Sequence, residues 1–185
     1  MTRIVFCWLG LLAAAASPAS ASCNHTVKVP WTSAKSFGLQ LSASSVGETC
    51  GTTALLLTVS TAKGDVLWAT SFLAQQVSIF SGDNARTDVA MKATLKDWVT
   101  IGQGKDVKLT TTKVLPDWKQ GEDRPLSEGE FGFFIDESKL RDTFLELRAK
   151  NLPMFCFVQG MESEGCIVAE DKSTISNIGG YTFPG

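Results

Sequence analysis

The chain has 185 residues, 44% of them hydrophobic, and a formal net charge of −2 at pH 7. A mildly acidic chain without clusters of basic residues lacks the electrostatic footprint of a nucleic-acid binder, so no nucleic-acid partner is expected. The length suits one domain that buries its own hydrophobic core.

Residues 1–21 have the pattern of a secretory signal peptide. Arg3 precedes an apolar run from residue 4 to residue 16, and Ala19 and Ala21 stand at positions −3 and −1 of a cleavage site. The run is shorter than the ~20 apolar residues of a membrane-spanning helix, and no later stretch reaches that length. We therefore expect a single mature domain over residues 22–185, without a transmembrane span, in a bacterial periplasm or secreted.

Cleavage of the signal peptide removes Cys7 and leaves four cysteines: Cys23, Cys50, Cys156 and Cys166. An even number of cysteines in an exported chain favours two disulfides, and four cysteines allow three pairings. The alternative is a lipoprotein anchored through Cys23. The usual aliphatic residue three places before a lipidated cysteine is missing, and lipidation would leave three thiols.

The first part of the mature chain predicts short strands. Residues 26–29 alternate as a strand, and Pro30 makes this an edge strand or ends it. Residues 37–41 form a second short strand candidate. The stretch 42–51 is rich in Ser and Gly, and this composition predicts a loop.

A central hairpin is predicted within residues 53–80, where two apolar runs flank a tight turn at Lys63-Gly64. This turn places Val59 opposite Trp68. One face of the hairpin is then apolar and belongs against a core, while the other is smaller and more polar. The apolar face carries Leu55, Leu57, Val59, Trp68 and Phe72.

Two amphipathic helices are predicted, over residues 86–100 and 137–150, from apolar residues at helical spacing. Asn84 or Thr87 is the expected N-cap of the first helix and Asp136 that of the second. The apolar stripes are Met91, Leu95 and Trp98 in one helix, and Leu140, Phe144 and Leu147 in the other.

Between and after the helices, further strands and loops are expected. Residues 107–115 and 131–135 predict strands, and residues 116–130 a long charged loop of the kind that often has a function. Residues 153–170 predict a second hairpin, and no element is predicted over residues 173–185.

The pairing of the cysteines follows from the two hairpins. If Cys156 faces Cys166, then Val158 faces Glu164 and Met154 faces Val168. Directly opposed residues lie close enough at Cα for a disulfide. We therefore predict the pairs Cys156–Cys166 and Cys23–Cys50, the latter tying the first strand to the start of the central hairpin. The fold class is α+β, with antiparallel hairpins forming a sheet of roughly six to eight strands and both helices packed on one face of it.

The sequence offers few catalytic groups. His25 is the only histidine, whereas a zinc site needs three or four ligands, and the cysteines form no C-x-x-C pair. We expect no structural metal and no cofactor. A Ser-His-Asp or Cys-His arrangement would have only His25 as its base. The acidic residues of the loops leave a carboxylate-based hydrolase as an alternative.

Two surfaces are candidates for binding a partner. One is the long loop, where Trp118 could stack on a sugar or anchor a protein, and the other is the tip of the second hairpin. The residues chosen from them are Trp118, Lys119, Gln159, Met161, Glu162 and Glu164. A ring that folds back on its own domain is the alternative for Trp118.

The sequence therefore predicts a non-catalytic exported domain that binds a protein or a component of the cell envelope. Two alternatives stand beside it, the carboxylate-based hydrolase of the envelope and a structural subunit of an envelope assembly. The identity of the partner does not follow from the sequence.

Overall fold

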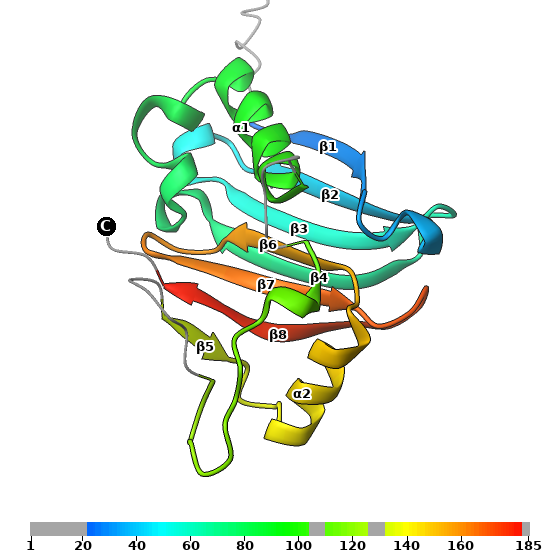
Figure 1. Ribbon diagram of the computed structural model, residues 1–185. Helices are drawn as coiled ribbons and strands as arrows, with labels where there is room; N and C mark the ends of the chain where they lie inside the picture. The colour runs from blue at the N-terminus through cyan, green and yellow to red at the C-terminus, as the bar shows by residue number, and fades with distance from the viewer. Residues whose placement is uncertain (1–21, 104–109, 126–131, 183–185) are drawn as a thin grey trace, which may run out of the picture.

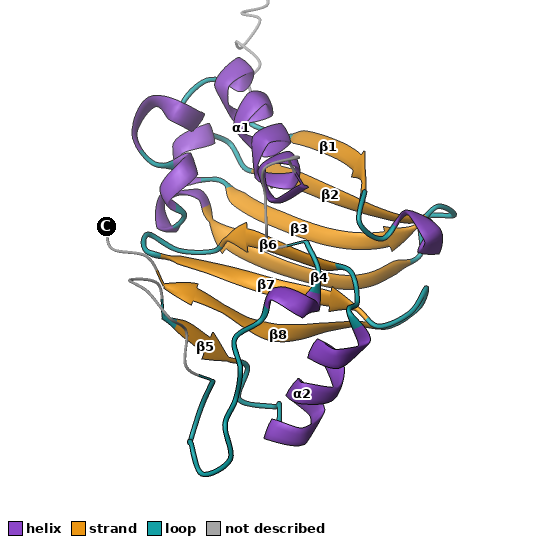
Figure 2. Ribbon diagram, viewed as in Figure 1, coloured by secondary structure: helices purple, strands orange, loops and turns teal. Residues whose placement is uncertain are grey.

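The computed structural model describes residues 22–103, 110–125 and 132–182, and these residues form two antiparallel four-stranded sheets and two α-helices (Figures 1 and 2). The α+β class, the two helices and the two disulfides predicted from the sequence are confirmed. The signal peptide predicted over residues 1–21 lies outside the described residues. The strands are β1 (His25–Pro30), β2 (Leu39–Val46), β3 (Ala54–Thr61), β4 (Val66–Leu73), β5 (Phe133–Ile135), β6 (Met154–Val158), β7 (Ser163–Ala169) and β8 (Ile175–Thr182), and the helices are α1 (Asp88–Thr100) and α2 (Arg141–Lys150).

The first sheet has the order β1-β2-β3-β4 and follows the chain as a meander. The register predicted for the central hairpin is confirmed, because Val59 lies opposite Trp68 and Leu55 opposite Phe72. β1 is an edge strand, as Pro30 indicates. β2 extends to Val46, so the loop predicted over residues 42–51 is wrong for its first half.

Serine side chains explain why β2 is longer than its composition suggests. The Ser45 hydroxyl accepts a hydrogen bond from the backbone N–H of His25, and the Ser44 hydroxyl pairs with that of Thr26 across the strands. Such cross-strand polar pairs stabilise a sheet although serine favours loops.

The second sheet has the order β5-β8-β7-β6. The predicted register of its hairpin is confirmed, with Cys156 opposite Cys166 and Val158 opposite Glu164. The eight strands are thus divided between two sheets, and the prediction of one sheet with both helices on one face is wrong in this respect. β8 lies in the stretch for which no element was predicted, and its two adjacent glycines conceal the strand pattern.

The second sheet is buried on both faces, and each face contributes to a different hydrophobic core. Phe155, Phe157 and Ile167 point into the first core, which they share with β2, β3 and α1. Cys156, Cys166 and Val168 point into the second core, which α2 covers from the other side (Figure 1). Alternation of side chains along each strand makes this division possible.

Helix α1 begins as predicted, because the Thr87 hydroxyl caps it by accepting a hydrogen bond from the N–H of Ala90. Its buried face covers the β1 and β2 half of the first sheet. The predicted stripe of Met91, Leu95 and Trp98 is buried, together with Val99.

Helix α2 begins at Arg141, four residues later than predicted, and this corrects the role of two residues. Asp136 does not cap the helix, because its carboxylate accepts a hydrogen bond from the N–H of Ser138 in the preceding turn. Leu140 precedes the helix and is 75% exposed, so it is not part of the apolar face. Asn151 ends the helix with a positive φ of 52°.

The strand predicted over residues 107–115 is not found in the described part of that range. Thr111 forms one isolated bridge with Pro153, and residues 112–114 form a 3-10 turn. The Thr112 hydroxyl donates to the carbonyl of Leu147 and accepts from the N–H of Leu152. These bonds hold Thr112 against the end of α2 and the connection from α2 to β6. Residues 112–114 therefore turn and do not continue as a strand.

Both predicted disulfides are present. Cys156 and Cys166 are directly opposed with a Cα–Cα distance of 4.1 Å, and Cys23 and Cys50 are 5.0 Å apart at Cα. Chain entropy predicts a stabilisation of about 2–3 kcal/mol for the shorter loop and somewhat more for the longer one.

Gly180 should be essential for the packing of β8. A Cβ atom at this position would clash with the backbone carbonyl oxygen of Glu164, in the neighbouring strand. Gly180→Ala should therefore lower the free energy of unfolding by about 3 kcal/mol, as overpacking does. Urea denaturation measures it. Gly51→Ala is the matched control, since an added Cβ meets nothing within 4 Å there, and equal midpoints for the two variants would contradict the prediction.

Candidate functional site

A groove of about 400 Å³ lies between β4, at the edge of the first sheet, and the β5–β8 side of the second sheet. A second hollow lies beside α2, and no aromatic side chain is among the described residues of its lining. The residues that line the groove are Trp68, Ala69, Thr70 and Phe72 from β4, Phe134, Ile135, Asp136 and Glu137 from β5 and its turn, and Phe157, Gln159, Gly165, Cys166, Asn177 and Gly179 from the rest of the second sheet.

Strand β4 presents its edge to this groove. Trp68, Ala69 and Thr70 are consecutive, so their side chains point to opposite faces of the sheet, yet all three line the groove. Among the described strands, β4 pairs only with β3. The outer edge of an unpaired strand carries a row of backbone N–H and C=O groups that can bind another extended chain.

The edge of β4 has none of the side chains that usually protect such strands. All eight residues from Val66 to Leu73 are uncharged, and none is proline. The opposite edge strand, β1, carries Lys28 and Pro30, which are common protecting residues. The start of β6 is covered, because the N–H of Met154 donates to the carbonyl of Thr110. Among these three edges, β4 is the least protected.

Aromatic rings hold the β4 wall of the groove in place. The Trp68 indole N–H donates to the side-chain oxygen of Asn177 on β8, at 3.1 Å. The rings of Trp68 and Phe72 contact that of Phe157, with centroid distances of 5.7 and 6.2 Å. Trp68 and Phe72 remain half-buried, so part of each ring is accessible from the groove.

The opposite wall is acidic. Asp136 and Glu137 follow β5 and both line the groove, while no lysine or arginine is among the described residues of the lining. Glu137 is exposed, and Asp136 is half-buried. The groove therefore combines a strand edge, aromatic surface and negative charge, which suits an extended ligand with positive charges.

Glu164 lies on β7, next in the chain to Gly165, which lines the groove. Its partner on the neighbouring strand β8 is Tyr181. Burial raises the pKa of the Glu164 carboxyl above its ordinary value of 4.5. Burial, followed by the negative charge of Glu164, raises the pKa of Tyr181 to about 12. A half-buried carboxyl group of this kind is a feature that binding sites and acid–base catalysts share.

The residues chosen from the sequence fall in three places. Gln159 lines the groove and Glu164 lies beside it, whereas Met161 and Glu162 are exposed at the hairpin tip. Trp118 and Lys119 lie elsewhere, in the loop that packs beside α2. The groove residues Trp68, Phe72 and Asn177 were missed, because a sequence does not reveal which strand becomes an unpaired edge.

Trp118 belongs to the second core. Its side chain is only 7% exposed, and its ring meets that of Phe144 at a centroid distance of 5.8 Å. Its indole N–H donates to the carbonyl of Glu122, and its own carbonyl accepts from Arg141. This burial agrees with the alternative given for Trp118, a ring that folds back on its own domain, and leaves little of the ring for a ligand.

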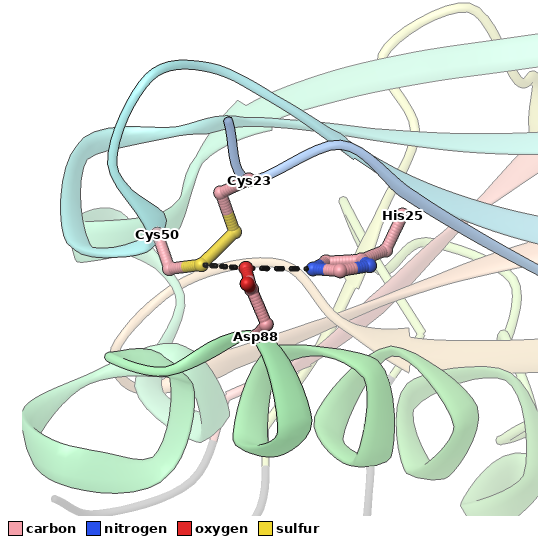
Figure 3. A group of neighbouring side chains, drawn as sticks. All are labelled: Cys23, His25, Cys50 and Asp88. Carbon is pink, nitrogen blue, oxygen red and sulfur yellow. Dashed lines mark hydrogen bonds and ion pairs between the residues drawn. A yellow bond between two sulfur atoms is a disulfide. The ribbon is translucent and has the colours of Figure 1, made fainter. Parts of the chain in front are cut away.

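A second group of polar side chains lies at the other side of the first sheet, where β1 meets α1. The His25 cluster consists of Cys23, His25, Cys50 and Asp88 (Figure 3). His25 Nε2 lies 3.1 Å from Asp88 Oδ1, and Cys50 Sγ lies 3.6 Å from the same oxygen. The sulfur is part of a disulfide and carries no proton, so this second approach is a contact and not a hydrogen bond.

Comparison with protein-family models, with curated proteins and with solved structures found no match to this chain. Over the described ranges, neither helix has the length and apolar character needed to cross a membrane.

Truncation of Trp118 should damage the fold. Trp118→Ala should lower the free energy of unfolding by about 3–5 kcal/mol, because it leaves a cavity beside Phe144. Lys119→Ala, next in the chain and exposed, is the control and should change it by no more than about 0.5 kcal/mol. Thermal and urea unfolding measure both variants. Similar stability of the two would show that the Trp118 ring is not a core residue.

Glu164→Gln should stabilise the protein at neutral pH. A carboxyl group whose pKa is raised in the folded state favours folding while it is protonated, below the ordinary value of 4.5, and loses this contribution as the pH rises through the folded pKa. The melting temperature of the variant should therefore exceed that of the original protein at neutral pH, and the difference should vanish below pH 4.5. A constant difference at all pH values would contradict the assigned cause.

Proposed function

We propose that this protein is a non-catalytic exported domain that binds an extended, basic segment of a partner protein, which pairs as an additional strand with β4. The observation that carries the proposal is the unprotected edge of β4 beside an acidic groove. Export is supported by the signal-peptide pattern of residues 1–21 and by the two disulfides, which persist in oxidising compartments.

Strand addition explains how a groove without a catalytic device could bind with useful affinity. Backbone hydrogen bonds to the edge strand supply affinity, and the side chains of alternate residues, inserted into pockets, supply specificity. β4 has eight residues, a length that accommodates a typical strand. The accessible parts of Trp68 and Phe72 offer aromatic surface for such side chains, and residues of this type dominate binding energy at interfaces.

The acidic wall selects the charge of the partner. Asp136 and Glu137 would face a basic segment, and their charges would attract lysine or arginine side chains while disfavouring acidic ones. Because Glu137 is exposed, this attraction should weaken as the salt concentration rises.

The two alternatives make different demands on the same residues. A carboxylate-based hydrolase is favoured by the raised pKa of Glu164, and would lose turnover when Glu164 is replaced by glutamine. A structural subunit would use the β4 edge to pair with a second copy, so its mass in solution would rise with concentration. The binding proposal expects neither result.

Charge reversal at Glu137 tests the proposal. The probes are two synthetic peptides long enough to span β4, which alternate valine or threonine with lysine in one peptide and with glutamate in the other. Fluorescence anisotropy should show binding of the lysine peptide alone. Glu137→Lys should weaken that binding by about tenfold, equal to about 1.4 kcal/mol.

Glu162→Lys is the matched control, because it makes the same charge change at the exposed hairpin tip, outside the groove lining. This variant should bind the lysine peptide as the original protein does. Loss of binding in Glu162→Lys but not in Glu137→Lys would place the site at the hairpin tip. Absence of binding to either peptide would overturn the proposal of strand addition to β4.

A further inference from the structure

The His25 cluster gathers four metal-ligating side chains from three parts of the chain. Cys23 precedes β1, His25 lies on β1, Cys50 begins the 3-10 turn before β3, and Asp88 is the first residue of α1. One ligand atom from each residue lies within 4.8 Å of all the others. Figure 3 shows the Asp88 carboxylate between the disulfide and the imidazole ring.

We propose that reduction of the Cys23–Cys50 disulfide converts the His25 cluster into a four-ligand site for zinc or a similar divalent transition metal. Two thiolates, one imidazole and one carboxylate are the ligand types that zinc binds in tetrahedral sites. The sequence predicted no metal site because Cys50 and Asp88 are far along the chain from Cys23 and His25, and the four residues form no recognised spacing. Only the fold brings them together.

A dithiol can serve as the reductant. The two thiols of the reductant transfer two electrons and two protons to the Cys23–Cys50 disulfide, so the reductant becomes a disulfide and the protein gains two thiols. The metal ion then displaces one proton from each thiol, and two protons are released to solvent as two metal–sulfur bonds form. His25 and Asp88 supply the remaining ligand atoms.

The distances already present are close to those of a tetrahedral site. With metal–ligand bonds of about 2.0–2.3 Å, the ligand atoms of a tetrahedral zinc site lie about 3.3–3.8 Å apart. Asp88 Oδ1 is 3.1 Å from His25 Nε2 and 3.6 Å from Cys50 Sγ. The main rearrangement is therefore the separation of the two sulfur atoms once their bond is broken.

The other disulfide gives a natural comparison within the same molecule. Among the described residues, the His25 cluster is the one group that could hold a metal in this way, and Cys156–Cys166 is not part of it. Cys23 and Cys50 are both buried, but Asp88 is exposed, with 55% of its side chain accessible, so a metal ion could enter from the α1 side.

Metal binding would couple the site to the redox state of the protein. A metal that binds only the reduced form makes reduction more favourable, by about 30 mV for each tenfold excess of free metal over its Kd. The bound metal would also replace the disulfide as the link between the start of β1 and the turn before β3.

Cobalt(II) is the probe, since cobalt–thiolate bonds give a charge-transfer band in the near ultraviolet and tetrahedral cobalt gives strong visible bands. The full chain would carry C7S, C156S and C166S, so that only Cys23 and Cys50 remain. After reduction with a phosphine and its removal under nitrogen, one equivalent of cobalt should bind with both spectral features, and zinc should displace it.

Two further variants distinguish a four-ligand metal site from binding of cobalt to the two thiols alone. H25Q and D88N leave the disulfide-forming cysteines in place, and each should weaken cobalt binding by at least about tenfold, equal to about 1.4 kcal/mol. Circular dichroism of the oxidised variants checks that each is folded. Absence of a cobalt–thiolate band from the reduced protein, whether or not that protein is folded, overturns the proposal. Cobalt binding by H25Q and D88N that is as tight as that of their parent also overturns it.

Discussion

The burial of the β6–β7 hairpin on both faces is the constraint on which the rest of the structure depends. Phe155 and Phe157 point into the first core, while Cys156, which lies between them, and Cys166, which lies opposite Cys156, point into the second. A slip of one residue in register would exchange these faces and empty both cores at once. The Cys156–Cys166 disulfide joins directly opposed residues, so it fixes the register that both cores require.

This arrangement also leaves the edge of β4 open. Helix α1 covers the β1 and β2 half of the first sheet, and the second sheet covers the remainder through rings such as Phe157, which contacts Trp68 and Phe72. These contacts hold β4 by its face, and no other described strand pairs with its outer backbone edge. A long, uncharged edge strand favours aggregation unless another chain pairs with it or covers it. The absence of lysine and proline from β4 is therefore a physical argument for a partner strand.

The sequence predicted the local elements better than their assembly. Both hairpin registers, α1 and both disulfides follow from alternation, turn chemistry and cysteine parity, which are local properties. The division into two sheets could not be predicted, because it depends on which strand edges meet. For the same reason the groove was missed, although Gln159, one of its residues, was chosen from the hairpin tip. The choice of Trp118 as a binding residue rested on its polar, proline-rich surroundings in the sequence. Its contact with Phe144, which is distant in the chain, could not be predicted from them.

The two disulfides differ in their surroundings, and this difference separates their physical roles. Cys156 and Cys166 lie in the second core among apolar side chains, and neither belongs to the His25 cluster. Cys23 and Cys50 lie against Asp88 and within reach of His25. Freed thiols there would be next to the two other ligand types that a divalent metal requires. One cross-link therefore serves the register of the sheet, whereas the other joins the start of β1 to the turn before β3, beside Asp88 of α1, at a point where an ion could replace it.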